Sequence, residues 1–242
     1  TIQNPRIMNR IMNSASDLNS LIIQHAEDAE LSKDGMINDG IIATKLGLQG
    51  IPVSAELLIL ERDLTLLEYN NCRYHISQIS SASSVEIIRE RKIKVNFSCG
   101  VSINNLSLNE NDIGDFKTFL KLSPPLRTED DRNALVQGLV DETIDVIVSD
   151  HKPEDEENKR LTFAQAETGA SGIETLLPLS LELYHNGSVN LETIIKALTS
   201  SPAKILKINK GNLSIGNDAD FCIVDINKPW VVRKEKLISK SK

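Results

Sequence analysis

Short apolar runs alternate with stretches of helical spacing along most of this chain. The run at 144–148 is rich in β-branched residues and has the length of a buried strand. The stretch at 54–69 places leucines three or four residues apart, which predicts a helix with one apolar face. Alternation of the two patterns predicts parallel strands joined by crossover helices, and therefore an α/β fold. The expected strands are 21–23, 73–80, 93–97, 119–122 and 144–148.

Helix-start signals add to this picture. Thr128 precedes three acidic residues, which is typical of an N-cap and first turn, so a helix is expected at 129–140. The segment 83–86 resembles a capping box and predicts another helix start. Two further helices are expected at 172–186 and 190–199.

The last part of the chain has a different pattern. Two short apolar stretches flank a turn rich in Gly, Asn and Asp between residues 211 and 225, which predicts a small β segment. We therefore divide the chain into an α/β part, residues 1–208, and the start of a C-terminal β part, residues 209–242.

Composition narrows the class of protein. The 242 residues are 40% hydrophobic and 25% charged, which is ordinary for a globular protein and unlike a disordered chain. The net charge of −7 argues against a nucleic-acid partner, because phosphate contacts need a basic surface. No apolar run approaches the roughly 20 residues that span a bilayer, so no membrane partner is expected. Three well-separated cysteines predict a reducing, cytoplasmic location.

Polar side chains that could carry chemistry fall at the ends of the expected strands. His25 follows the first strand, Gln78 lies near the end of the second, and Asp150 with His151 follows the last. Strand carboxyl ends meet at the active site of parallel α/β folds, and His and Asp side chains are typical zinc ligands of metallohydrolases. A structural role is the alternative for each of them. A lone His25 or His75 more often forms a hydrogen bond within the fold, and the Asp150-His151 pair could simply cap a loop.

Two other features bear on function. His185 precedes Asn-Gly at an expected helix end, where a histidine suits the helix dipole, so a structural role is expected for it. No Gly-rich phosphate loop follows any expected strand, so nothing supports a nucleotide site.

A set of short motifs, in order and with ordinary spacing, identifies a family resemblance. They are Gln24-His25-Ala26-Glu27-Asp28, Gly50-Ile51-Pro52, Pro124-Pro125-Leu126-Arg127, Ser149-Asp150-His151-Lys152-Pro153 and Gly172-Ile173-Glu174-Thr175-Leu176-Leu177-Pro178. Together they resemble the dihydroorotases of the amidohydrolase superfamily over the whole of residues 1–242. The resemblance is closest to the degenerate, non-catalytic branch that is associated with aspartate carbamoyltransferase.

The resemblance implies a (β/α)8 barrel of the TIM type. This chain would hold only the later strands of that barrel, about five of the eight. The family's His-x-His motif and its metal-bridging residue would then lie upstream of Thr1. We therefore expect the chain, which begins without an initiator methionine, to be the C-terminal portion of a longer protein.

The resemblance also assigns roles to individual residues. His25 matches a zinc ligand, and Asp150 matches a residue that contacts the metal and acts as general base. Three positions depart from the family: Gln78 stands where another histidine ligand is expected, Ser123 replaces an asparagine, and Glu154 replaces a substrate-binding histidine. A neutral amide is a poor zinc ligand beside imidazole, and an anion at position 154 would repel a carboxylate substrate. We therefore expect zinc binding to be weak or lost.

Three functional hypotheses follow from the resemblance. The departures favour a non-catalytic, dihydroorotase-like partner of the aspartate carbamoyltransferase catalytic chain. The alternative is an active zinc dihydroorotase, which interconverts N-carbamoyl-L-aspartate and dihydroorotate by opening and closing a cyclic amide. An amidohydrolase for another cyclic amide or imide ranks last, because only Glu154 supports it. Association of the chain into a homo-oligomer is compatible with all three.

Overall fold

The computed structural model describes residues 1–239 of the chain. The elements follow in the order α1 (Pro5–Asp17), β1 (Leu21–Gln24), β2 (Ile37–Asn38), α2 (Ile41–Leu46), β3 (Gly50–Ile51), α3 (Val53–Tyr69), β4 (Arg73–Ile79), α4 (Ala82–Lys92), β5 (Ser98–Ser102), α5 (Ile103–Ser107), α6 (Glu129–Val140), β6 (Val146–Val148), α7 (Glu156–Lys159), α8 (Ile173–His185), α9 (Leu191–Leu198) and α10 (Ser200–Leu206). Short 3-10 helices lie at Glu110–Ile113, Thr118–Leu120 and Lys234–Lys236.

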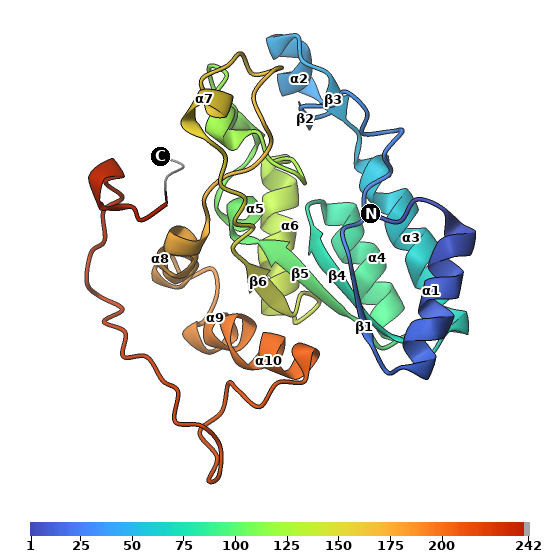
Figure 1. The fold of residues 1–242 in the computed structure, drawn as a ribbon. Coiled ribbons are helices and arrows are strands. Elements are labelled where there is room, and N and C mark those ends of the chain that lie inside the picture. Colours follow the sequence, from blue (N-terminus) through green and yellow to red (C-terminus); the bar gives the residue numbers. More distant parts are fainter. Residues whose placement is uncertain (240–242) are drawn as a thin grey trace.

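Four of the strands form one parallel sheet, in the order β1-β4-β5-β6 (Figure 1). Ile22 pairs with Tyr74 across β1 and β4, and Ile76 pairs with Cys99 across β4 and β5. The two short strands β2 and β3 form a separate parallel pair. Parallel neighbours need crossover connections, and helices supply them here, which confirms the predicted α/β fold.

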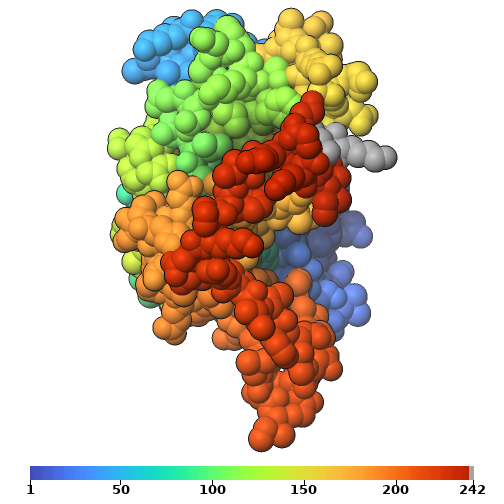
Figure 2. Space-filling model, turned by 90° about the vertical axis from the view of Figure 1, so that its left-hand side faces the viewer, coloured from blue at the N-terminus to red at the C-terminus, as the bar shows by residue number. Residues whose placement is uncertain are grey.

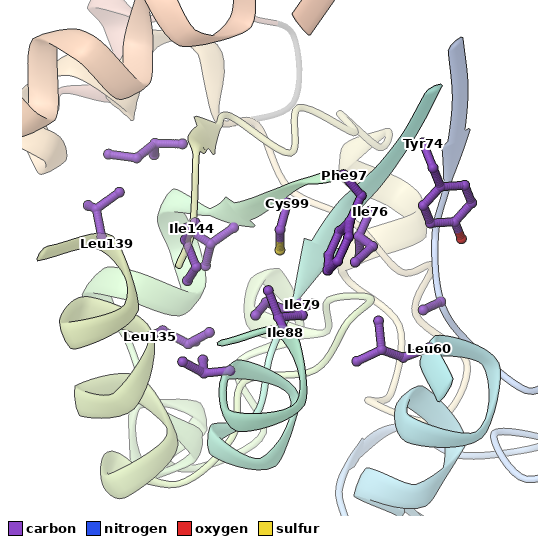
Figure 3. Packing of buried hydrophobic residues seen from close by; sticks show 14 of the residues in the cluster. Leu60, Tyr74, Ile76, Ile79, Ile88, Phe97, Cys99, Leu135, Leu139 and Ile144 are labelled. Atoms are coloured by element: carbon purple, nitrogen blue, oxygen red, sulfur yellow. The ribbon is translucent and has the colours of Figure 1, made fainter. Parts of the chain in front are cut away.

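The main core lies between this sheet and a row of helices. Neighbouring helices contact one another in the sequence α1, α3, α4 and α6. Leu60 of α3, Ile88 of α4 and Leu135 of α6 are at most 1% exposed, and they belong to the same cluster as Ile76 and Cys99 of the sheet (Figure 3). Complete burial of each large apolar side chain contributes on the order of 1.5–3 kcal/mol. This packing fixes the positions from which the strand ends project.

Two of the five expected strands are wrong. The strand expected at 93–97 is displaced, because the chain turns there and β5 begins only at Ser98. The small residues of β5 carry little β propensity, yet Cys99 and Val101 are completely buried within the sheet. The segment expected as a strand at 119–122 is part of a 3-10 turn instead, and the Lys121 carbonyl accepts a hydrogen bond from the loop that follows β6. Within residues 1–239 the main sheet therefore has four strands.

The expected helices are confirmed to within a few residues, as α3, α6, α8 and α9. Thr128 caps α6 as predicted: its hydroxyl accepts the N–H of Asp131, whose carboxylate accepts the N–H of Thr128. The cap of α4 is Ser81 rather than Ser83, since the Ser81 hydroxyl accepts the N–H of Ser84. No helix in residues 1–239 combines the length and the apolar character needed to cross a membrane.

The described part of the C-terminal segment, residues 209–239, contains no strand, so the predicted small β segment is not formed there. Its turn is present, because the N–H of Asn217 donates to the carbonyl of Ser214 at 3.1 Å. The flanking apolar side chains lie in solvent, with Phe221 70% and Ile223 93% exposed, and Figure 2 shows the segment running along the outside of the molecule. A strand is stable only beside a hydrogen-bonding neighbour, and residues 1–239 provide none here. Residues 240–242, the end of the predicted β part, lie outside the described residues.

Two buried lysines fasten the loop after β6 to the segment at 118–121. Lys121 Nζ donates to three carbonyl oxygens within residues 163–166, at 2.8 to 3.0 Å. Lys159 is 1% exposed, and its Nζ donates to the carbonyls of Thr118 and Glu167 at 3.1 and 2.6 Å. Burial lowers the pKa of both ammonium groups, that of Lys159 to about 8.

Raising the pH is expected to stabilise the fold through Lys159. The unfolded chain holds this proton up to the ordinary lysine pKa of about 10.4, so between about pH 8 and that value the unfolded state binds more protons than the folded state. The free energy of unfolding should therefore rise over this window, by on the order of 2 kcal/mol from this group. Urea titrations of the wild type and of Lys159→Met, each at about pH 8 and at about pH 10.4, measure this rise in the free energy of unfolding. The rise should be smaller in the variant, in which Lys121 still contributes, and an equal rise in both proteins would contradict the prediction.

Candidate functional site

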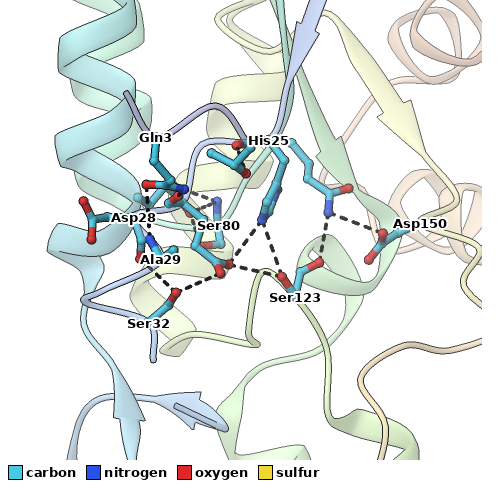
Figure 4. Close-up of polar contacts among 12 residues, drawn as sticks. Gln3, His25, Asp28, Ala29, Ser32, Ser80, Ser123 and Asp150 are labelled. Atoms are coloured by element: carbon cyan, nitrogen blue, oxygen red, sulfur yellow. Dashed lines mark hydrogen bonds and ion pairs between the residues drawn. The ribbon is translucent and has the colours of Figure 1, made fainter. Parts of the chain in front are cut away.

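Four positions of the site expected from the sequence come together at the carboxyl edge of the main sheet. Figure 4 labels three of these residues, His25, Ser123 and Asp150. His25 follows β1 directly, Gln78 lies near the end of β4, and Asp150 follows β6 by two residues. Because the strands run parallel, these positions lie at one end of the sheet. Ser123, from the segment between the second 3-10 helix and α6, contacts both His25 and Gln78.

His25 belongs to a small hydrogen-bonded group with Glu27 and Ser123. Its Nε2 lies 3.2 Å from Glu27 Oε2 and 3.4 Å from Ser123 Oγ, and Ser123 Oγ donates to Glu27 Oε2 at 3.2 Å. Ser32 Oγ donates to the other carboxylate oxygen of Glu27 at 2.9 Å. The hydrogen bond with His25 is the main cause that lowers the pKa of Glu27, against the opposing effect of burial. The imidazole therefore faces a carboxylate that stays ionised.

Gln78 connects Asp150 to this group. Gln78 Nε2 donates to Asp150 Oδ1 at 3.3 Å and to the carbonyl of Ser123 at 3.1 Å. Burial raises the pKa of Asp150, while the hydrogen bond from Gln78 and the charge of His25 act in the opposite direction. Asp150 also has a φ of 47°, a left-handed conformation that is uncommon outside glycine and is concentrated at functional sites.

The described residues do not fit a complete zinc site. Zinc takes three or four His, Cys, Asp or Glu ligands from the protein, and residues 1–239 contain no group of three such side chains placed to hold a metal. His25 and Asp150 are the two ligands expected from the sequence. Gln78 stands where a third was expected, and its amide N–H, directed at the Asp150 carboxylate, has no lone pair to offer a cation.

The other histidines take structural positions. His75 Nδ1 lies 2.8 Å from Ser98 Oγ at the start of β5, and burial lowers the pKa of His75. His151 Nδ1 accepts the backbone N–H of Gly172 at 3.1 Å, at the beginning of α8. His185 is the last residue of α8, as predicted, and its Nε2 lies 2.9 Å from a backbone carbonyl of the C-terminal segment.

Glu154 lies on the loop after β6. Its Oε1 is 3.7 Å from Lys152 Nζ, and its side chain is 19% exposed. The adjacent ammonium partly neutralises this carboxylate, which weakens the repulsion expected from Glu154 towards an anionic substrate. That repulsion stays a prediction.

A buried polar network supports the segment that carries Ser123. Glu56 of α3 is 3% exposed and accepts hydrogen bonds from both the N–H and the hydroxyl of Ser80. Arg127, also 3% exposed, donates from Nε to Ser80 Oγ at 2.9 Å and from Nη1 to Asn38 Oδ1 at 2.8 Å. Because Arg127 follows Ser123 by only four residues, the network limits how far Ser123 can move from His25.

Sequence reasoning assigned no role to Glu27, Glu56 or Arg127. For Glu27 a signal was available, because a carboxylate two residues after His25 can reach the same imidazole. For Arg127 the signal was its place in a family motif, but nothing linked it to Glu56, since the two lie far apart in the chain and only the packing of α3 against the strand ends brings them together.

Comparisons with known proteins agree with this architecture. A model described as the amidohydrolase family matches residues 1–240. Over the full length of this chain, the sequence is 40% identical to the dihydroorotase of Ehrlichia canis and 41% identical to that of Ehrlichia chaffeensis. In both cases 54% of the relative is covered, so the chain spans about half the length of the curated relatives it matches.

Solved structures show the same fold. L-hydantoinase (dihydropyrimidinase) from Arthrobacter aurescens superposes with a TM-score of 0.79 at 25% identity, over 90% of this chain and 50% of the other. Dihydroorotase from Saccharomyces cerevisiae, in complex with 5-fluoroorotic acid, gives a TM-score of 0.68 at 16% identity, over 86% of this chain and 56% of the other. The second likeness supports the fold alone. The α/β structure described here thus corresponds to about half of such a protein.

Proposed function

Because this chain belongs to the amidohydrolase family, we propose that it is a non-catalytic, dihydroorotase-like component of pyrimidine biosynthesis that binds the catalytic chain of aspartate carbamoyltransferase. Its 40% identity to dihydroorotases supports the dihydroorotase-like part of this proposal. The proposed location is the cytoplasm.

The loss of catalysis rests on one observation, the contacts of Gln78. Its amide N–H is bonded to Asp150 and to the carbonyl of Ser123, at the place where the family resemblance expects a ligating imidazole. An imidazole offers a lone pair to zinc, whereas an amide N–H offers none. Ser123 likewise directs its hydroxyl to Glu27, so a second family position serves internal hydrogen bonding.

The proposed partner role is supported by the intact core and buried polar network of the chain. The buried network of Glu56 and Arg127, the caps of the helices and the packed core all remain, while a ligand position has changed. A rigid surface is sufficient for binding another protein, but hydrolysis of an amide also needs a complete catalytic group.

Mixing the full-length protein that carries these 242 residues with the aspartate carbamoyltransferase catalytic chain of the same organism tests the proposal. We expect a stable complex by size-exclusion chromatography with light scattering, zinc below one equivalent, and no dihydroorotase turnover above that of Asp150→Asn. Failure to form the complex would overturn the partner role. Turnover that Asp150→Asn abolishes would overturn the loss of catalysis.

One observation favours the alternative, an active dihydroorotase. His25 and Asp150 are both present at one edge of the sheet and are connected through Ser123 and Gln78. In an active protein Asp150, whose pKa burial raises, would accept and return a proton beside the substrate amide. Glu27 would hold the His25 ring in place. The turnover measurement with Asp150→Asn separates this alternative from the main proposal.

A further inference from the structure

A basic groove lies at the amino edge of the main sheet. Figure 1 shows α9 and α10 on this side of the sheet. It has a volume of about 440 Å³ and is lined by the first residues of β1, β4 and β5 together with parts of α9 and α10. Its charged lining residues are Arg73, Glu142, Asp145, Lys196, Lys204 and Lys207. The seven residues of β4 span about 20 Å, so this groove is distinct from the site of His25 and Asp150 at the other edge.

The two acidic residues of the groove are already paired. Lys196 Nζ lies 2.6 Å from Glu142 Oε1. Asp145 Oδ2 lies 2.7 Å from Lys92 Nζ and also accepts the N–H of Cys99 at 2.8 Å. Each carboxylate therefore has its own counterion and does not balance the remaining cations.

Three cations of the groove have no carboxylate partner within residues 1–239. Arg73 donates to the backbone carbonyl of Ile205, and Lys207 donates to Asn19 Oδ1 at 3.1 Å, so both have neutral acceptors. The side-chain ammonium group of Lys204 has neither a hydrogen bond nor an ion pair in the same part of the chain. Three positive charges thus face one hollow on a protein whose net charge is −7.

This arrangement favours an anionic occupant. Like charges around a shared hollow repel one another, and an anion entering it removes that cost and is attracted by all three. The volume lies within the range of about 300–1,000 Å³ that is typical of small-molecule sites. Ser200 and Ser201 also line the groove, and hydroxyl groups donate readily to phosphate or carboxylate oxygens.

We propose that the basic groove binds a small molecule that carries at least two anionic groups, either phosphates or carboxylates. Arg73 supplies a planar set of N–H donors suited to an oxyanion, and Lys204 and Lys207 supply point charges. A ligand with one negative charge would leave two of the three cations unbalanced, which is why a second anionic group is required. The site is separate from the carboxyl edge and goes beyond the dihydroorotase-like function proposed above.

Isothermal titration calorimetry of the 242-residue chain with inorganic pyrophosphate tests this site. Binding is expected at low ionic strength and should weaken as salt is added. Lys204→Gln and Lys207→Gln should each weaken it about fivefold, and both side chains are exposed, so neither substitution threatens folding. The matched control is Lys45→Gln, which removes an exposed lysine of α2 outside the groove and should leave the affinity unchanged.

A parallel titration with succinate separates the two ligand chemistries, because the tighter of the two probes identifies whether phosphate or carboxylate oxygens suit the groove. Asp150→Asn should bind as the wild type does. No binding of either probe at millimolar concentration would overturn the proposal. So would an equal loss in Lys45→Gln, or a changed affinity in Asp150→Asn, which would place the anion at the other edge. Complex formation with the transcarbamoylase is measured separately, so the two proposals can fail independently.

Discussion

Replacing Arg127 with methionine is expected to lower the free energy of unfolding by about 3–5 kcal/mol, a large share of the roughly 5–15 kcal/mol that keeps a domain folded. The Arg127 guanidinium is buried and donates to Ser80, to Asn38 and to the carbonyl of Ile51. Its removal takes a donor from Ser80 Oγ and from Asn38 Oδ1, and it removes a positive charge that interacts with the buried carboxylate of Glu56.

Urea denaturation followed by circular dichroism measures this loss. Arg160→Met is the matched control, because Arg160 pairs with Glu156 one turn away on the surface and its side chain is 71% exposed. Such a pair contributes at most about 0.5 kcal/mol. Arg127→Lys should fall between the two, since it keeps the charge and loses the forked donors. A loss below about 1 kcal/mol in Arg127→Met would show that the network does not stabilise the fold.

Gln78→His is expected to increase zinc affinity by at least about tenfold. Substitutions of residues that only support the metal ligands change metal affinity by about 10- to 100-fold, and this substitution adds a ligand itself. It replaces an amide N–H that donates to Asp150 with an imidazole nitrogen, on the strand between those that lead to His25 and to Asp150. Three potential ligands would then lie at one edge of the sheet. Competition with a chromophoric chelator gives the affinity, and elemental analysis gives the stoichiometry.

Two controls separate a metal site from a general effect of adding a histidine. Gln137→His introduces an imidazole on the exposed side of α6 and should leave zinc affinity at the wild-type value. Combining Gln78→His with Asp150→Asn should cancel the gain, because the carboxylate ligand is lost. An equal gain from Gln137→His would contradict the idea that Gln78 keeps the site from binding metal.

Much of the fold could be predicted because its signals are local. Leucine spacing at 54–69 and the N-cap at Thr128 depend on residues within a few turns, and both helices are present. The strands were harder to predict from the sequence. β5 is rich in small residues, and only its position between β4 and β6 makes it a strand. The apolar residues around Phe221 have strand-like composition but no neighbouring strand within residues 1–239.

The candidate site likewise has features that the sequence predicts and features that only the folded structure shows. Placement of His25, Gln78 and Asp150 at one edge followed from parallel strands, whose carboxyl ends must meet. The contacts among these side chains could not be predicted from the arrangement of the strands. Nothing in the local sequence indicates that Gln78 bridges Asp150 and Ser123.

By itself, the sequence determined the class of fold, the helices and the residues that stand at the strand ends, because hydrophobic periodicity and capping act over a few residues. Only the tertiary structure decided which of those residues touch. It paired Glu27 with His25, buried Arg127 beside Glu56, and gathered three unpaired cations at the opposite edge. Such contacts join segments that are distant along the chain, and their energies depend on burial and on neighbours that exist only once the sheet and its helices have packed.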